Sequence, residues 1–118
     1  GFTRDELVDI YSCCDMVADD YGAGWFGSIC VEGSSCSKPV LSYIDEPAMG
    51  TIYDWHPFLS SDTPEGNCEY IARCYFDRSF SQRQGELGRK WVLEYHCQEA
   101  AGKRYVKEFQ RLVKESWR

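Results

Sequence analysis

Apolar residues near both ends of the chain recur at the three- and four-residue steps of an amphipathic helix. Thr3 and Glu6 form a capping-box pattern that predicts the start of the first helix, and Gly22–Gly24 predict its end. The apolar stripe of this helix is Leu7, Ile10, Cys14, Val17 and Tyr21. A second helix is predicted over about residues 98–117, with the stripe Tyr105, Val106, Phe109, Leu112 and Val113.

Between these helices the pattern changes to the two-residue alternation that is typical of strands. The predicted strands are 25–32, 40–44, 51–55, 68–77 and 89–97. Breaker residues predict a loop over 56–67, and the glycines of 78–88 indicate a connector between the last two strands. The sequence therefore predicts one α+β domain over 1–118, an antiparallel sheet of about 3–5 strands packed with an N-terminal and a C-terminal helix.

Seven cysteines in 118 residues favour a disulfide framework and an oxidising compartment. They are Cys13, Cys14, Cys30, Cys36, Cys68, Cys74 and Cys97. Their spacing contains no C-x2-C or C-x4-C pair and the chain has no H-x3-H, so a zinc site is not favoured. We therefore expect a disulfide-stapled domain with one thiol left free, and neither a metal nor another cofactor.

The adjacent pair Cys13 and Cys14 raises the question of which thiols bridge. A vicinal bridge would strain the backbone. Cys14 lies on the inward stripe of the first helix, so we expect it to bridge to Cys74 first and to Cys97 second. Cys13 lies about 100° further round that helix. Its expected partners are the loop thiols Cys30, Cys36 or Cys68.

Two further pairings are weighed by distance. On one continuous strand, Cys68 and Cys74 would lie roughly 20 Å apart, beyond the reach of a disulfide. Cys30 and Cys36 are separated by residues that can turn, so this bridge is possible. The sequence leaves the connectivity open.

Net charge is −6, but the two parts of the chain differ in sign. Residues 1–72 carry thirteen acids and two bases, whereas residues 73–118 carry six acids and eleven bases. Segregated solvated charge is the simpler interpretation, and a basic face that meets an acidic partner or phosphate is the alternative. The overall acidity does not favour a nucleic-acid partner, and no apolar run is long enough for a membrane span.

Two histidines are candidate general bases. His56 follows Asp54, and His96 shares a predicted strand face with Glu94. If the 68–77 and 89–97 strands align, Glu69, Arg73 and His96 gather on one sheet face. That set resembles the base, phosphate clamp and acid of small secreted microbial ribonucleases. The favoured interpretation is still a solvent-facing polar side of the sheet, because alternation alone creates such faces.

Other candidate chemistry is weaker. The chain has no glycine-rich phosphate loop, G-x-S-x-G elbow, H-E-x-x-H or C-x-x-C motif. Four aromatic residues outside the predicted helices could form a contact surface, but we expect most of them to complete the core or seal the loops. These are Trp25, Tyr53, Trp55 and Phe58. Enzymatic activity is therefore not the favoured prediction.

Taken together, the length, seven cysteines, high aromatic content, absence of a glycosylation sequon and absence of a catalytic motif resemble the small secreted cysteine-rich effectors of plant-pathogenic fungi. Tyr11-Ser12-Cys13 also resembles the aromatic-x-Cys pattern of one such effector group, as does Tyr95-His96-Cys97. The resemblance is one of class across the whole chain. It implies an avirulence-type protein that is secreted and that binds a host target, a resistance protein or a co-secreted effector.

Two hypotheses follow. The first is a secreted, non-enzymatic effector or virulence protein that acts by binding another protein. The alternative is a secreted ribonuclease-like hydrolase or toxin that uses Glu69, Arg73 and His96.

Overall fold

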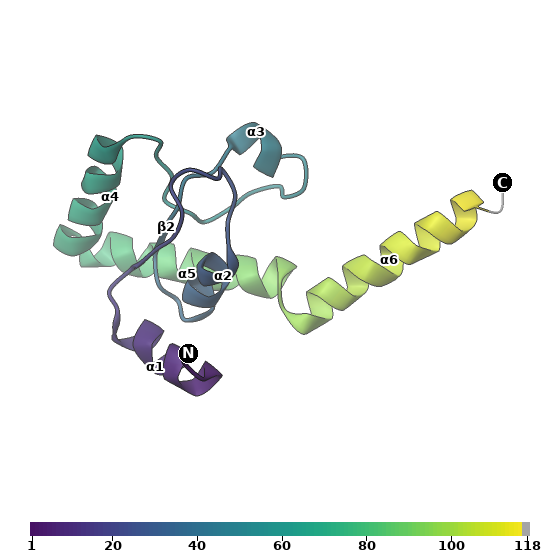
Figure 1. The fold of residues 1–118 in the computed structure, drawn as a ribbon, viewed down its shortest axis with the longest axis horizontal. Coiled ribbons are helices and arrows are strands. Elements are labelled where there is room, and N and C mark those ends of the chain that lie inside the picture. Colours follow the sequence, from purple (N-terminus) through teal and green to yellow (C-terminus); the bar gives the residue numbers. More distant parts are fainter. Residues whose placement is uncertain (117–118) are drawn as a thin grey trace.

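A computed structural model describes residues 1–116 of the chain. These residues form six helices and one parallel pair of two-residue strands (Figure 1). In chain order the elements are α1 (Arg4–Cys13), β1 (Val17–Ala18), α2 (Ser28–Ser35), β2 (Val40–Leu41), α3 (Glu46–Met49), α4 (Pro64–Phe76), α5 (Arg78–Tyr95) and α6 (Gln98–Ser116). The prediction of an antiparallel sheet of three to five strands is therefore wrong, and the protein is mainly helical.

The long helix α5 runs along the body, and α2 packs against it more extensively than any other element (Figure 1). Two glycines of α5 allow this close approach. A Cβ atom at Gly85 would collide with the backbone carbonyl of Ser37, which follows α2. A Cβ atom at Gly88 would lie 3.1 Å from the Ser34 hydroxyl oxygen, within α2 itself. The glycines that indicated a connector are therefore positions where the backbones pack tightly within a helix.

The main core is aromatic and is built around Trp91 of α5, whose side chain is completely buried. Its indole N–H donates a hydrogen bond to the carbonyl of Trp55 over 3.0 Å. The rings around it have centroids 4.4–6.0 Å away and belong to Phe26, Tyr53, Phe58, Tyr95 and His96. The expectation that the loop aromatics complete the core is confirmed, because Tyr53 and Phe58 are buried and Trp25 and Trp55 pack against them.

The predicted first helix begins correctly and ends too late. Thr3 and Glu6 form the capping box, but α1 ends at Cys13, and the Cys14 backbone is already extended. The chain then pairs with a distant segment: the Val17 N–H donates to the Pro39 carbonyl over 2.9 Å. Because β1 lies parallel to β2 in this pairing, residues 17 and 18 cannot continue the helix.

The predicted hairpin of strands 68–77 and 89–97 is also wrong, because both segments are helical. The Thr63 side chain caps α4 by accepting a hydrogen bond from the Gly66 N–H. The next helix, α5, starts directly after α4, because Asp77 serves both helices. It is the C-cap residue of α4, and its carboxylate caps the start of α5 by accepting a hydrogen bond from the Phe80 N–H over 2.9 Å. Of the other predicted strands, 25–32 overlaps α2, 40–44 contains the short β2, and 51–55 is irregular.

The C-terminal helix is confirmed over Gln98–Ser116, whereas Trp117, its last predicted residue, lies outside the described part of the chain. This helix projects from the body as an arm (Figure 1). The radius of gyration is therefore 16.4 Å, compared with about 13–14 Å for a compact domain of this length. None of the described helices is both long and apolar enough to cross a bilayer.

Candidate functional site

The three residues of the hydrolase hypothesis lie at two ends of α5. Glu69 and Arg73 both lie on α4 and line a shallow pocket of about 330 Å³. The Arg73 guanidinium stacks 3.9 Å from the ring centroid of Phe80, near the start of α5. His96 follows the last residue of the same helix, so it lies roughly 24 Å along the axis from Phe80. The structure brings Glu69 and Arg73 together and separates His96 from both.

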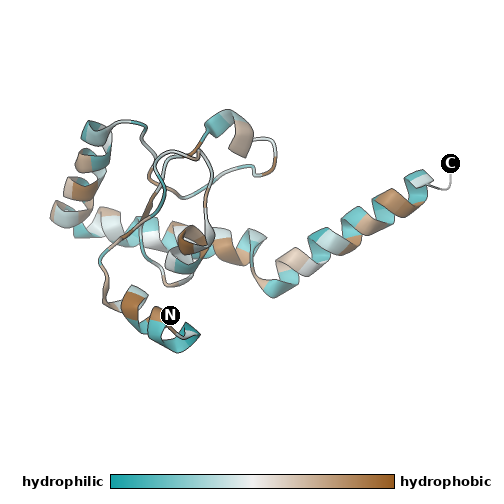
Figure 2. Cartoon of the chain, in the orientation of Figure 1, coloured by the Kyte–Doolittle hydropathy of each residue, from teal (hydrophilic) through white to brown (hydrophobic). Residues whose placement is uncertain are grey.

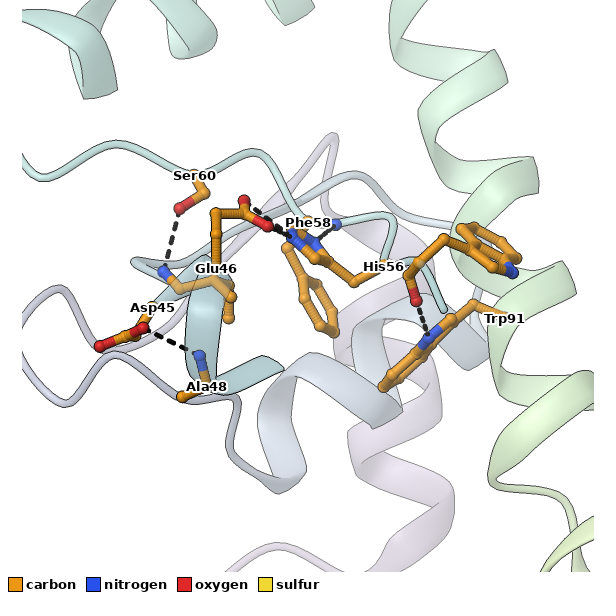
Figure 3. Close-up of polar contacts among 9 residues, drawn as sticks. Asp45, Glu46, Ala48, His56, Phe58, Ser60 and Trp91 are labelled. Carbon is orange, nitrogen blue, oxygen red and sulfur yellow. Dashed lines mark hydrogen bonds and ion pairs between the residues drawn. The ribbon is translucent and has the colours of Figure 1, made fainter. Parts of the chain in front are cut away.

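His56 is a structural clamp for the loop that covers the aromatic core (Figure 3). Its Nδ1 accepts a hydrogen bond from the Phe58 N–H over 3.2 Å. Nε2 therefore carries the proton, and it lies 3.0 Å from both carboxylate oxygens of Glu46 on α3. Because both ring nitrogens are engaged, this histidine is not free to act as a general base.

His96 lies at the bend between α5 and α6, stacked among aromatic rings. Its centroid is 4.4 Å from that of Trp91 and 5.6 Å from that of Tyr53. Burial and the positive charge of Arg104 lower the pKa of His96, so the ring stays neutral at pH 7. Its Nε2 is buried and has no hydrogen-bond partner among residues 1–116. A general base must reach the proton it removes, and this nitrogen does not contact solvent.

An open groove of about 930 Å³ lies beside His96, where α6 leaves the body. One wall is the segment that contains Thr51 and Tyr53, and the other is the first half of α6. Arg104 reaches across it, with its guanidinium 5.3 Å from the ring centroid of Tyr53. This contact joins the first half of α6 to the segment that contains Tyr53.

All seven cysteines are free thiols, so the prediction of a disulfide-stapled domain is wrong. Cys74, the first expected partner of Cys14, and Cys30, one of three candidate partners of Cys13, are both buried. Burial, and a hydrogen bond to the Asp19 carboxylate, raise the pKa of Cys30 to about 12, which makes it an unreactive core residue. Cys68 and Cys74 both lie on α4, where six residues span about 9 Å, still too far for a bridge.

The remaining thiols lie at helix ends or on the surface. Cys13 and Cys68 are exposed, and Cys36 follows the last residue of α2. Cys14 Sγ donates to the carbonyl of Ile10 over 3.1 Å, and Cys97 Sγ donates to that of Leu93 over the same distance. The described residues contain no group of three or more His, Cys, Asp or Glu placed to hold a metal. With the bridges absent, a secreted location stays a prediction from composition alone.

One side of α6 forms an exposed apolar surface that no part of residues 1–116 buries. Figure 2 shows hydrophobic residues recurring along this arm. No residue of α6 is buried. We call the following set the apolar face of α6, given with exposed fractions: Tyr105 67%, Val106 56%, Phe109 64%, Leu112 47% and Val113 56%. Exposed apolar patches of this kind mark sites of protein or membrane contact.

The acids and bases of α6 differ in whether they form ion pairs. The three acids of α6 are engaged within the helix: Glu99 pairs with Lys103, and Glu108 and Glu115 both pair with Arg111. Three bases of α6 have no ion-pair partner among residues 1–116, and they are Arg104, Lys107 and Lys114. At 100° per residue these three bases lie on the side of α6 opposite the apolar face, so the helix has one apolar side and one positively charged side.

Sequence patterning identified the five residues of the apolar face as the inward stripe of a packed helix. The pattern was right, and the assumption that they face the chain's own core was wrong. The width of the apolar stripe indicated a larger contact. Val106 and Val113 make the stripe wider than the narrow a/d stripe of a coiled coil, as in helices that pack on a broad apolar surface. The sequence does not say on which chain that surface lies.

Comparisons with known proteins found no matching family model, no similar curated protein and no similar solved structure.

Proposed function

We propose that this chain is a protein-binding module that docks its partner on the apolar face of α6. The observation that carries the proposal is the exposure of five large apolar side chains on one side of a 19-residue helix. In proteins, most of the stability of a helix comes from the packing of its apolar side rather than from intrinsic helix propensity. A partner that covers Tyr105, Phe109 and Leu112 would supply this packing.

The excess surface of the chain supports the same function. It exposes 8133 Å², whereas a compact monomer of 13.6 kDa exposes about 6,600 Å². A specific interface of standard size needs about 800 Å² from each partner. The excess of roughly 1,500 Å² is therefore large enough for such an interface.

The resemblance to secreted cysteine-rich effectors implies the same class of function, contact with another protein. The hydrolase alternative lacks a comparable argument, because Glu69 and Arg73 are separated from His96 and the Nε2 atom of His96 is buried. We therefore propose the binding function alone.

Replacing Phe109 and Leu112 together by glutamine tests this proposal. Glutamine keeps helix propensity close to that of leucine, so the change removes apolar contact and leaves the helix in place. We expect at least about a thirtyfold loss of affinity, the size of effect that central aromatic and aliphatic anchors produce in interfaces. The measurement is retention of proteins from an extract of the source tissue on the immobilised full chain, followed by titration of whichever protein is retained.

The matched control carries Lys103→Gln and Gln110→Ala, on the polar side of the same helix. It should retain the same proteins as the wild type, with circular dichroism confirming equal helix content in all three. Equal retention by the wild type and by the Phe109→Gln, Leu112→Gln variant would exclude the apolar face as the docking surface.

A further inference from the structure

The junction between α5 and α6 is a bend of two residues, and His96 is the first of them. The His96 and Cys97 N–H groups both donate to the Val92 carbonyl over 2.8 Å, which closes the end of α5. The Ala101 N–H donates to the Cys97 carbonyl over 2.9 Å, which opens α6. The arm therefore leaves the body at a residue whose side chain can change its charge at mildly acidic pH (Figure 1).

The imidazole ring of His96 is surrounded by aromatic rings. Their centroids lie 4.4 Å away in Trp91, 5.4 Å in Phe26 and 5.6 Å in Tyr53. The Nε2 atom is buried and has no hydrogen-bond partner among residues 1–116. A neutral ring is well placed in such surroundings, whereas a positively charged ring would lose hydration and gain no acidic partner in return.

The acids around His96 are engaged with other groups. Asp54 accepts a hydrogen bond from the Tyr95 hydroxyl over 3.5 Å, and Glu108 forms an ion pair with Arg111. The titratable and charged groups on the elements packed against the ring are Glu94, Tyr95 and Cys97 beside it in the chain, Tyr53 and Asp54 on the segment opposite, and Arg104, Tyr105, Lys107 and Glu108 on α6, while residues 25–27 around Phe26 carry none.

Arg104 links the charge of His96 to the position of the arm. Its guanidinium lies 5.3 Å from the centroid of the Tyr53 ring, on which His96 also stacks. Burial of the ring and the positive charge of Arg104 together lower the pKa of His96 from its ordinary value of 6.5. Linkage is reciprocal, so a proton bound to His96 must weaken both the burial of its ring and the approach of Arg104.

The direction of the pH dependence follows from this lowered pKa. When the junction opens, His96 regains an ordinary pKa and binds its proton more tightly than in the closed junction. The closed junction is therefore fully stable above pH 6.5 and loses stability as the pH falls below that value.

From these observations we propose that the α5–α6 junction is an acid-sensitive hinge, in which a proton taken up from solvent by His96 separates Arg104 from Tyr53 and frees the first turns of α6 from the body. This inference goes beyond the proposed function and does not depend on what covers the apolar face of α6. At neutral pH the arm is held against the body by the Arg104–Tyr53 contact. In acid the same arm would take many directions.

Nuclear magnetic resonance tests the hinge on the full chain, which has only two histidines. Proton spectra follow both imidazole rings from about pH 7.5 to about pH 4.5, and nitrogen-15 relaxation follows the amides of residues 98–104. We expect His96 to titrate below its ordinary pKa. With the same midpoint, backbone order parameters over residues 98–104 should fall from about 0.85 to below about 0.6.

The His96→Phe variant keeps an aromatic ring at the junction and removes the titration. Its order parameters over residues 98–104 should stay high across the whole pH range. Loss of order in this variant equal to that of the wild type would overturn the proposal. A wild-type His96 ring that stays neutral throughout, or that titrates with no loss of order in α6, would overturn it too.

A second variant tests the coupling without altering the histidine. Arg104→Gln removes the positive charge that opposes protonation, so the titration midpoint of His96 should rise toward 6.5. The matched control is Lys103→Gln, because Lys103 is paired with Glu99 and does not line the groove beside His96. It should leave the midpoint unchanged. Equal midpoints for Arg104→Gln and Lys103→Gln would show that His96 is not coupled to the arm and would overturn the hinge.

Discussion

Replacing Trp91 by alanine should destabilise the protein by about 3–5 kcal/mol, the range for large aromatic residues in cores. The side chain is completely buried and contacts rings from three separate segments and from its own helix. Its loss also leaves the Trp55 carbonyl without its hydrogen-bond donor. For a domain of this size that free energy corresponds to a thermal midpoint lowered by roughly 10–25 °C.

Differential scanning calorimetry or thermal circular dichroism measures this change. Leu93→Ala, two residues along the same helix, is the matched control because that leucine is half exposed. The Leu93→Ala substitution should lower the free energy of unfolding by less than about 1 kcal/mol. Similar midpoints for Trp91→Ala and Leu93→Ala would show that the aromatic cluster is not the core of the fold.

Replacing Gly85 by alanine should destabilise the protein by about 1–3 kcal/mol or more, because overpacking forces the backbone to move. The new Cβ would collide with the Ser37 carbonyl, a backbone group that cannot rotate away. Gly102 of α6 has no atom within 4 Å of its Cβ position. Gly102→Ala should therefore stabilise the helix by up to about 1 kcal/mol, from helix propensity alone.

The two glycine substitutions can be compared by urea unfolding, followed by the far-ultraviolet circular dichroism of the helices. Opposite signs are expected for Gly85 and Gly102, although both lie inside helices. If Gly85→Ala were stabilising like Gly102→Ala, α2 and α5 would not pack as closely as the structure describes.

The parts of the fold that depend on local sequence were predictable. The capping box of α1 and the whole of α6 follow from residues close to one another in the chain, and both were identified. The end of α1 was not identified, because it depends on the pairing of Val17 with Val40, a residue that is remote in the sequence. No residue near Cys13 carries a stop signal for a helix.

The region 64–95 shows how a two-residue alternation can mislead. Cys68, Tyr70, Ala72 and Cys74 alternate as in a strand, but Thr63 followed by Pro64 is also the start signal of a helix. Asp77 caps the following helix without any intervening loop, so the junction lacks the glycine or proline that would separate two elements. The cysteine pairings and the Glu69, Arg73 and His96 cluster both depended on the sheet, and they lost their geometric basis with it.

The binding surface was half predictable. The residues of the apolar face were evident in the sequence. That α6 projects from the body depends on the bonded bend at His96 and Cys97 and on the Arg104–Tyr53 contact, which are tertiary features. Sequence patterning could therefore find the face and could not say that its partner lies outside the chain.

Hydrogen exchange along α6 tests most directly whether its apolar face is covered by another molecule rather than by its own chain. In dilute solution, the amides of Val106 to Val113 should exchange rapidly, while those around Trp91 in α5 stay protected, because an unpartnered helix opens readily. When a bound partner covers the face, exchange over Val106 to Val113 should slow at least tenfold with no change in α5. Strong protection of Val106 to Val113 in the most dilute sample would contradict an external partner, since only the chain itself could then cover the helix.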